Sequence, residues 1–452
     1  MQKFISKYGL AAHLAILAVA PLFLSPVCVF WLSALAAAWL LMEPSRIGGE
    51  YLDEARQRVL RGILRDPVFW LSAVVVAATA VCFWNSGIQL SYEAESQIWS
   101  VAPPPMPILP GSVSGHGAGE FAAAIAFAVV VQGCRHGLGR AARQTFLICA
   151  SLFAGVAVAV LSVMLPMGYE LSRVLVECST VHPYFIGMAF GLYMLAGTIG
   201  LVCAYENKWL VAIPLTVVAI GGNAAGVFLF APACVSAAFA VAELLLLVYS
   251  FVYALKRLVG SGEFKFLVSV LMALTLAGVL VIAVLPEEVL KARLAPFETG
   301  KFFVESFVSA RVALSAIAFK AWKASPWLGS GLGSFPLDLR FLATEADWSL
   351  VTPEQTSPLN GYWHLLSEQG LIGVVLIVCP LGLLLWSFVV GMIRGFRQGL
   401  PHPAVWLGLV ALLVVLAEMS VDASFLLPGA WLAVASFLAI SANSFPKEKR
   451  NG

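Results

Sequence analysis

Charged side chains are scarce in this sequence of 452 residues. Asp, Glu, Lys and Arg together make up 12% of the chain, whereas soluble domains carry roughly 25%. Hydrophobic residues make up 60%, and they occur in runs long enough to cross a bilayer. The composition therefore excludes an ordinary soluble protein and predicts an all-α integral membrane protein built from membrane-spanning helices.

The sequence also lacks an excess of either charge and a cysteine framework. The formal net charge is only +2, and nothing in the sequence points to a nucleic-acid partner. Seven of the eight cysteines fall in or at the ends of apolar runs, and Cys178 stands alone in a polar connection. This placement argues against a disulfide framework or a zinc site, and we expect neither a metal nor a cofactor.

Twelve apolar stretches are candidates for membrane spans, since a span needs about 20 apolar residues, or fewer where the bilayer thins. They are centred near residues 10–24, 27–42, 68–85, 119–134, 146–165, 184–204, 209–221, 232–254, 265–285, 371–393, 403–420 and 425–442. The first is interpreted as a span, with a cleaved signal peptide as the alternative. The seventh is short and Gly221-Gly222-Asn223 follows it, so residues 209–254 are either two spans or one span and a broken helix.

The distribution of positive charge predicts the orientation, because short cytoplasmic loops accumulate Lys and Arg. With the N-terminus inside, 19 of the 27 Lys and Arg residues lie in cytoplasmic segments, and Arg173 alone lies in a short external loop. The remaining seven lie in one long interruption. Both termini are therefore predicted to be cytoplasmic.

Three parts follow from this arrangement. Residues 1–285 form a bundle of nine spans, residues 286–370 form a large helical external (periplasmic) loop, and residues 371–452 form spans ten to twelve and a cytoplasmic tail. Residues 50–65 of the first part have an apolar helical face, which predicts a helix on the inner membrane surface or a solvated connector. The prolines between Ser86 and Gly117 predict a stiff, extended external segment.

The long interruption is interpreted as the functional part of the chain, because loops of this length are usually functional or disordered. Recurrent aromatic and aliphatic residues predict that it buries a small core, and residues 303–322 have the apolar spacing of an amphipathic helix near the bilayer surface. Residues 291–340 carry seven cations against three anions. The cations are Lys291, Arg293, Lys301, Arg311, Lys320, Lys323 and Arg340.

This surplus favours an anionic partner, since a guanidinium can donate two parallel hydrogen bonds to a phosphate. For any single lysine, contact with anionic lipid headgroups is the alternative. The glycines of Gly329-Ser330-Gly331-Leu332-Gly333 favour a tight turn or close packing over nucleotide binding, because no Lys-Ser/Thr ending follows them.

A second helix is predicted from Asn360 to Gly370, where the chain returns to the membrane. His364 and Glu368 are four residues apart and therefore share a face of that helix. Glu368 would orient the imidazole of His364 and raise its basicity. The pair is a candidate general base, with a purely structural salt bridge as the alternative.

The stretch from Arg311 to Gly373 resembles the signature region of the O-antigen ligase and polymerase superfamily of bacterial membrane glycan enzymes. The matching positions are Arg311, Pro326, Leu328, Gly329, Gly331, Gly333, Phe335, Asn360, Tyr362, Glu368, Gly370, Leu371, Ile372 and Gly373. Near the C-terminal end, Ser420-Val421-Asp422 with Pro428 resembles a further motif of the same superfamily.

The resemblance implies about twelve membrane-spanning helices in a GT-C-type fold, with the large external loop between spans nine and ten over a lipid-facing cavity. It implies transfer of a glycan from a polyprenyl-diphosphate carrier to an acceptor sugar, lipid or protein hydroxyl, without a metal. Arg311, His364 and Glu368 are the expected catalytic residues. The expected substrate-binding residues are Arg293, Lys320, Arg340, Asn360 and Asn223.

Two positions depart from the pattern of the superfamily. Leu359 stands where its histidine is expected, and Asn223 stands where an arginine is expected. Leucine cannot accept a proton and asparagine cannot neutralise a phosphate. Three hypotheses follow: a divergent transferase in which His364 is the base, an inactive paralogue that binds the carrier lipid or acts as a scaffold, and a secondary transporter.

Overall fold

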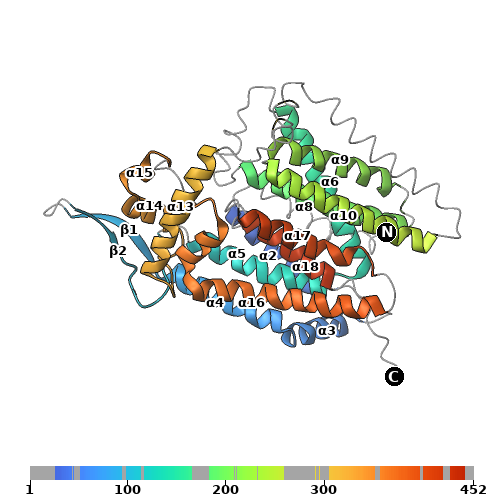
Figure 1. Ribbon diagram of the computed structural model, residues 1–452. Coiled ribbons are helices and arrows are strands. Elements are labelled where there is room, and N and C mark those ends of the chain that lie inside the picture. Colours follow the sequence, from blue (N-terminus) through green and yellow to red (C-terminus); the bar gives the residue numbers. More distant parts are fainter. Residues whose placement is uncertain are drawn as a thin grey trace.

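The computed structural model describes most of the bundle and most of the long loop predicted for residues 286–370. The described residues are 26–42, 44, 51–93, 98–113, 117–164, 183–207, 209, 211–231, 233–258, 291, 295, 305–351, 357–397, 401–420 and 428–442. Long helices lie side by side in a bundle, and a smaller group of elements covers one end of it (Figure 1). Residues 292–294, which include the predicted site residue Arg293, lie outside this description.

Ten described helices coincide with predicted spans. They are α2 (Pro26–Met42), α4 (Pro67–Trp84), α5 (Gly117–Gln132), α6 (Arg140–Met164), α8 (Pro183–Glu206), α9 (Ala212–Phe230), α10 (Ala233–Leu258), α16 (Gly361–Arg397), α17 (Ala404–Met419) and α18 (Pro428–Ala442). Among the described residues, six helices are long and apolar enough to cross a membrane. The predicted spans at 10–24 and 265–285 fall outside those residues, so the count of twelve stays a prediction.

The seventh predicted span is a separate helix. Helix α9 continues through Gly221, Gly222 and Asn223 without a break and ends at Phe230. Ala231 has an extended backbone conformation and separates α9 from α10. The alternative of one span and a broken helix is therefore wrong for residues 212–258.

Residues Leu52–Leu64 form helix α3, whose sequence has the apolar stripe predicted for residues 50–65. Ala55 and Val59 on that stripe are buried. At its C-terminal end the chain turns at Asp66, which caps α4 and lies 2.9 Å from Nε of Arg135 in the π-helical turn η2 (Gly133–Gly137). The position of α3 on the membrane surface stays a prediction.

The segment from Ser86 to Gly117 corrects the expectation of an all-α chain. Strand β1 (Ser86–Glu93) pairs antiparallel with β2 (Ile98–Ala102) and parallel with the short β3 (Ser112–Val113), in the order β2-β1-β3. The prolines that suggested a stiff extended segment begin only at Pro103, just after β2, where a missing N–H costs no ladder hydrogen bond. The hairpin of β1 and β2 projects from the end of the bundle (Figure 1).

The long loop of residues 286–370 buries a core of its own, as predicted. The expected amphipathic helix is α13 (Glu305–Ala324), and it is followed by α14 (Phe335–Leu342) and α15 (Glu345–Trp348). The buried members of this core are Ala313, Leu314, Ile317, Ala318, Phe335, Leu339, Val351 and Leu359. Helix α13 also packs against α16, so the small core rests on the helix that re-enters the bundle.

Candidate functional site

The glycine-rich loop between α13 and α14 packs on a break in α16. Gly329, Gly331 and Gly333 all have positive φ angles, of 72°, 108° and 76°. A Cβ atom at Gly329 would lie 2.4 Å from the carbonyl carbon of Glu368, so a residue with a side chain does not fit there. The prediction of a tight turn with close packing is confirmed.

Helix α16 is broken at Gly370, where φ is 61° and ψ is −170°. The loop satisfies the backbone groups that the break releases. Ser330 N donates to Ser367 O at 2.8 Å and Gly331 N to Glu368 O at 2.9 Å, while Leu371 N donates to Pro326 O at 2.9 Å. The predicted boundary at Gly370 is thus a sharp bend held by the glycine-rich loop.

Glu368 lies in the last turn before this bend and is 7% exposed. Its Oε2 accepts a hydrogen bond from Gly333 N at 3.0 Å, and its Oε1 accepts one from Phe335 N at 3.1 Å. The loop therefore fixes the carboxylate with two backbone donors, which are the kind of partners that stabilise a buried anion.

His364 completes this cluster from one turn earlier in α16. Its Nε2 lies 3.2 Å from Oε1 of Glu368, and its ring lies 6.1 Å from the ring of Phe335. The Nδ1 atom is buried and has no hydrogen-bond partner among the described residues. The predicted pairing of His364 with Glu368 is present, and Nε2 is the nitrogen that Glu368 orients.

A second carboxyl group lies near Glu368 on α14. Burial raises the pKa of Asp338 to about 6, and the charge of Glu368 adds to this rise. Hydrogen bonds from Ser330 and Ser334 act in the opposite direction and favour the carboxylate. Ser334 Oγ lies 3.3 Å from Oδ2 of Asp338.

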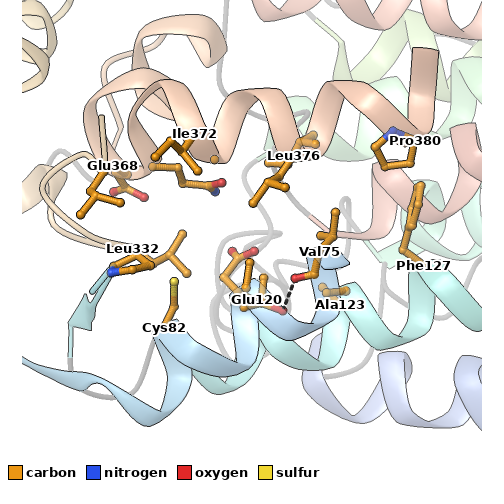
Figure 2. Close-up of a pocket in the computed structure, with 18 of the residues that line it drawn as sticks. Val75, Cys82, Glu120, Ala123, Phe127, Leu332, Glu368, Ile372, Leu376 and Pro380 are labelled. Carbon is orange, nitrogen blue, oxygen red and sulfur yellow. Dashed lines mark hydrogen bonds between the residues drawn. The ribbon is translucent and has the colours of Figure 1, made fainter. Parts of the chain in front are cut away.

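A pocket with a cavity volume of about 150 Å³ opens beside the cluster, between α4, α5 and α16. Figure 2 shows Glu368 at one end of it and Phe127 and Pro380 at the other, with Glu120 between Glu368 and Val75. Most of its wall is apolar, and Val75 and Leu376 lie between the two ends (Figure 2). The polar end is therefore the end nearest to the glycine-rich loop.

Arg311 lies on α13, outside the residues that line this pocket. Its side chain is half-buried. Arg311 and Glu418 of α17 both interact electrostatically with Cys234 of α10. The arginine therefore lies near the ends of α10 and α17 that carry these two residues. Because α13 packs against α16, the predicted arginine and the predicted base come from two helices in direct contact.

The other predicted site residues are dispersed. Asn360 caps α16, since its Oδ1 accepts hydrogen bonds from Tyr362 N at 3.1 Å and Trp363 N at 3.2 Å. Asn223 is fully buried in α9, and its Nδ2 donates to the carbonyl oxygen of Ser151 at 3.0 Å. Lys320 and Arg340 are exposed on α13 and α14, and Arg293 falls outside the described residues.

Sequence reasoning missed Glu120, which lies in the first turn of α5 and lines the pocket. The available signal was an acidic residue placed at the start of an otherwise apolar span. Such a residue is readily explained by its favourable interaction with the N-terminal end of a helix dipole, and only the packing of α5 beside α16 places it in the pocket with Glu368. Among the described residues, no group of three or more His, Cys, Asp and Glu side chains is arranged to hold a metal ion.

The chain was compared with known protein families. Residues 224–378 match the family described as O-Antigen ligase. The matched region begins in α9, includes α13 and the glycine-rich loop, and ends in α16 after the bend. A comparison with curated proteins found no match.

Proposed function

We propose, from the membership of this chain in the O-antigen ligase superfamily through residues 224–378, that it transfers a glycan from a polyprenyl-diphosphate carrier. The acceptor is a hydroxyl group of a sugar or a lipid. The family match supports a role like that of an O-antigen ligase or polymerase in the assembly of cell-surface glycans. The apolar helices support a multi-pass membrane protein, and we place it in the bacterial inner membrane.

The observation that carries this proposal is the hydrogen-bonded pair of His364 and Glu368 within the matched region. A general base must lie within hydrogen-bonding reach of the proton that it removes, in the correct tautomer. Glu368, held by Gly333 N and Phe335 N, accepts the Nε2 proton and leaves the lone pair on Nδ1. The unpartnered Nδ1 is then the atom that takes the proton of the acceptor hydroxyl.

The proposed step balances as a single displacement. Nδ1 of His364 removes the hydroxyl proton while the acceptor oxygen forms a bond to the anomeric carbon of the glycan. The bond between that carbon and the diphosphate oxygen breaks, and the electron pair leaves with the carrier diphosphate. Preorganised cations stabilise such a leaving group because negative charge develops on it in the transition state. Arg311 is the proposed source of that charge.

The proposal is tested with membrane vesicles that contain a lipid-linked oligosaccharide and an acceptor. We expect wild-type protein to transfer the glycan, and Arg311→Ala to reduce transfer at least tenfold, as expected for loss of a charge at a developing anion. Lys323→Ala is the matched control, since Lys323 is an exposed cation on the same helix. Equal transfer by Arg311→Ala and Lys323→Ala would remove Arg311 from the proposed mechanism.

Leu359 favours a second candidate, an inactive paralogue that binds the carrier lipid. Leu359 occupies the position of the expected histidine with a positive φ of 52°, and its side chain is buried in the core of the external loop. If the wild type transfers no glycan, Leu359→His separates the candidates. Gain of transfer would identify a lost catalytic residue, and continued binding of the carrier without transfer would support the paralogue.

A further inference from the structure

We propose that the pocket between α4, α5 and α16 binds a single-chain amphiphile whose head group donates hydrogen bonds and carries no negative charge. A long-chain alcohol or amine has this chemistry. The inference deepens the proposed function by assigning this molecule to the acceptor side of the reaction, and it rests on the proposed function for that assignment alone.

The shape of the pocket fits one apolar chain. Val75 of α4, Phe127 of α5 and Leu376 of α16 line it from three helices, and these helices belong to the membrane-spanning part of the bundle. Figure 2 shows Val75 and Leu376 between Glu368 at one end and Phe127 and Pro380 at the other. A chain whose head group lies between Glu120 and Glu368 therefore extends along apolar walls toward Phe127 and Pro380.

The charge at the polar end selects the head group. The ionisable residues that line the pocket are Glu120, Glu368 and Cys82, and none of the lining residues is Lys or Arg. A phosphate at this end would face two carboxyl groups in surroundings of low dielectric constant, where repulsion between like charges is strong. A hydroxyl or an ammonium group can instead donate to the same oxygen atoms.

Glu120 is the group available for this contact. Glu368 already accepts hydrogen bonds from Gly333 N and Phe335 N and lies 3.2 Å from His364. Glu120 lines the same pocket, and its carboxyl group points into it between Glu368 and Val75 (Figure 2). A head group bound at Glu120 lies in the pocket that Glu368 also lines, and Glu368 is the carboxylate that orients His364. For this reason we assign the molecule to the acceptor side of the reaction.

The location of the apolar chain is tested with photoreactive dodecyl probes on the purified full-length protein in lipid nanodiscs. We expect a dodecylamine or dodecanol probe to label peptides that contain residues 75–82, 120–127 and 372–381. Val75→Trp should reduce labelling about tenfold by filling the pocket. Val74→Trp is the control, because Val74 lies on the same helix, is 48% exposed and does not line the pocket.

The head-group assignment is tested with the same probes. Wild-type protein should be labelled about tenfold more by the amine than by a dodecyl phosphate probe, and Glu120→Gln should lower this ratio. Glu345→Gln, an exposed carboxylate on α15, should leave the ratio unchanged.

Three results would overturn the inference: equal labelling by amine and phosphate probes, equal effects of Val74→Trp and Val75→Trp, or no specific labelling of protein that is folded by circular dichroism. Labelling requires no glycan transfer, so a protein that transfers no glycan can still show the expected labelling. Conversely, absence of specific labelling would not change the result of the transfer assay.

Discussion

Nε2 of His364 lies 3.2 Å from Oε1 of Glu368, one turn away in the same helix and immediately before the bend at Gly370. The geometry of this pair depends on the glycine-rich loop, which supplies two backbone donors to Glu368. The glycine-rich loop thereby links the fold of the segment from α13 to α15 to the orientation of the proposed base.

Gly329→Ala is expected to destabilise the protein and to abolish the orientation of Glu368. The new Cβ atom would lie 2.4 Å from the carbonyl carbon of Glu368, and φ at this position is 72°. Strained backbone conformations of this kind cost about 1–3 kcal/mol, and the clash adds to that cost. The melting temperature in detergent should fall and transfer should be lost.

Gly382→Ala is the matched control for that substitution. Gly382 lies in α16 after the bend, and a Cβ atom there would meet nothing within 4 Å. An alanine in a helix is about 1 kcal/mol more favourable than a glycine, so this variant should melt at the same temperature or higher. A Gly329→Ala protein as stable as Gly382→Ala would contradict the packing described for the loop.

The buried carboxyl group of Asp338 is expected to make the folded protein less stable as the pH rises from about 4 to about 6. Burial raises the pKa of this carboxyl from 3.8 to about 6, so the folded state binds its proton more tightly than the unfolded state. Stability from this group is therefore complete below about pH 4 and is lost as the pH rises through 6. Asp338→Asn has no such titration.

The measurement is the difference in melting temperature between Asp338→Asn and the wild type at several values of pH. We expect the variant to gain a few degrees relative to the wild type between pH 4 and pH 7. Asp347→Asn provides a contrast, because hydrogen bonds from Thr344 hold the pKa of Asp347 below its usual value. A difference for Asp338→Asn that does not change with pH would show that its carboxyl group titrates normally.

Much of the secondary structure in residues 286–370 was predictable because its signals are local. The spacing of apolar residues predicted α13, and Gly370 marked the end of the helix that contains His364 and Glu368. The alternation of Ile88, Leu90 and Tyr92 is a local signal for β1, but it stands next to the prolines that begin at Pro103 and that favour an extended, unpaired segment. Strand β3 is only two residues long and pairs with β1 from a distant part of the segment, so no local pattern indicates that pairing.

The candidate site was predictable only where its residues share one helix. His364 and Glu368 are four residues apart, so their contact follows from helical geometry. Glu120 reaches the same pocket from a helix more than two hundred residues earlier, and only the packing of α4, α5 and α16 brings it there. Asn360 stands immediately before a helix, where asparagine is a favoured capping residue. Its position alone therefore predicts the capping role that it has in the structure, whereas the resemblance implied substrate binding.

Asn223→Ala is expected to reduce stability by about 1 kcal/mol and to leave the KM for the lipid-linked glycan unchanged. Its Nδ2 donates to the backbone oxygen of Ser151 and lies 3.2 Å from the Ser151 hydroxyl, inside the bundle. Thermal unfolding and steady-state kinetics on the same preparation separate the two effects. A higher KM at unchanged stability would instead support the substrate-binding role predicted for Asn223.

The central claim is that His364 and Glu368 act as one unit in glycan transfer, and a double-mutant cycle under single-turnover conditions tests it most directly. We expect His364→Ala to lower the transfer rate by about 10²–10⁴-fold, Glu368→Gln to lower it less, and the double variant to be no slower than His364→Ala alone. Independent, multiplicative losses, or an unchanged rate in folded His364→Ala protein, would contradict the account.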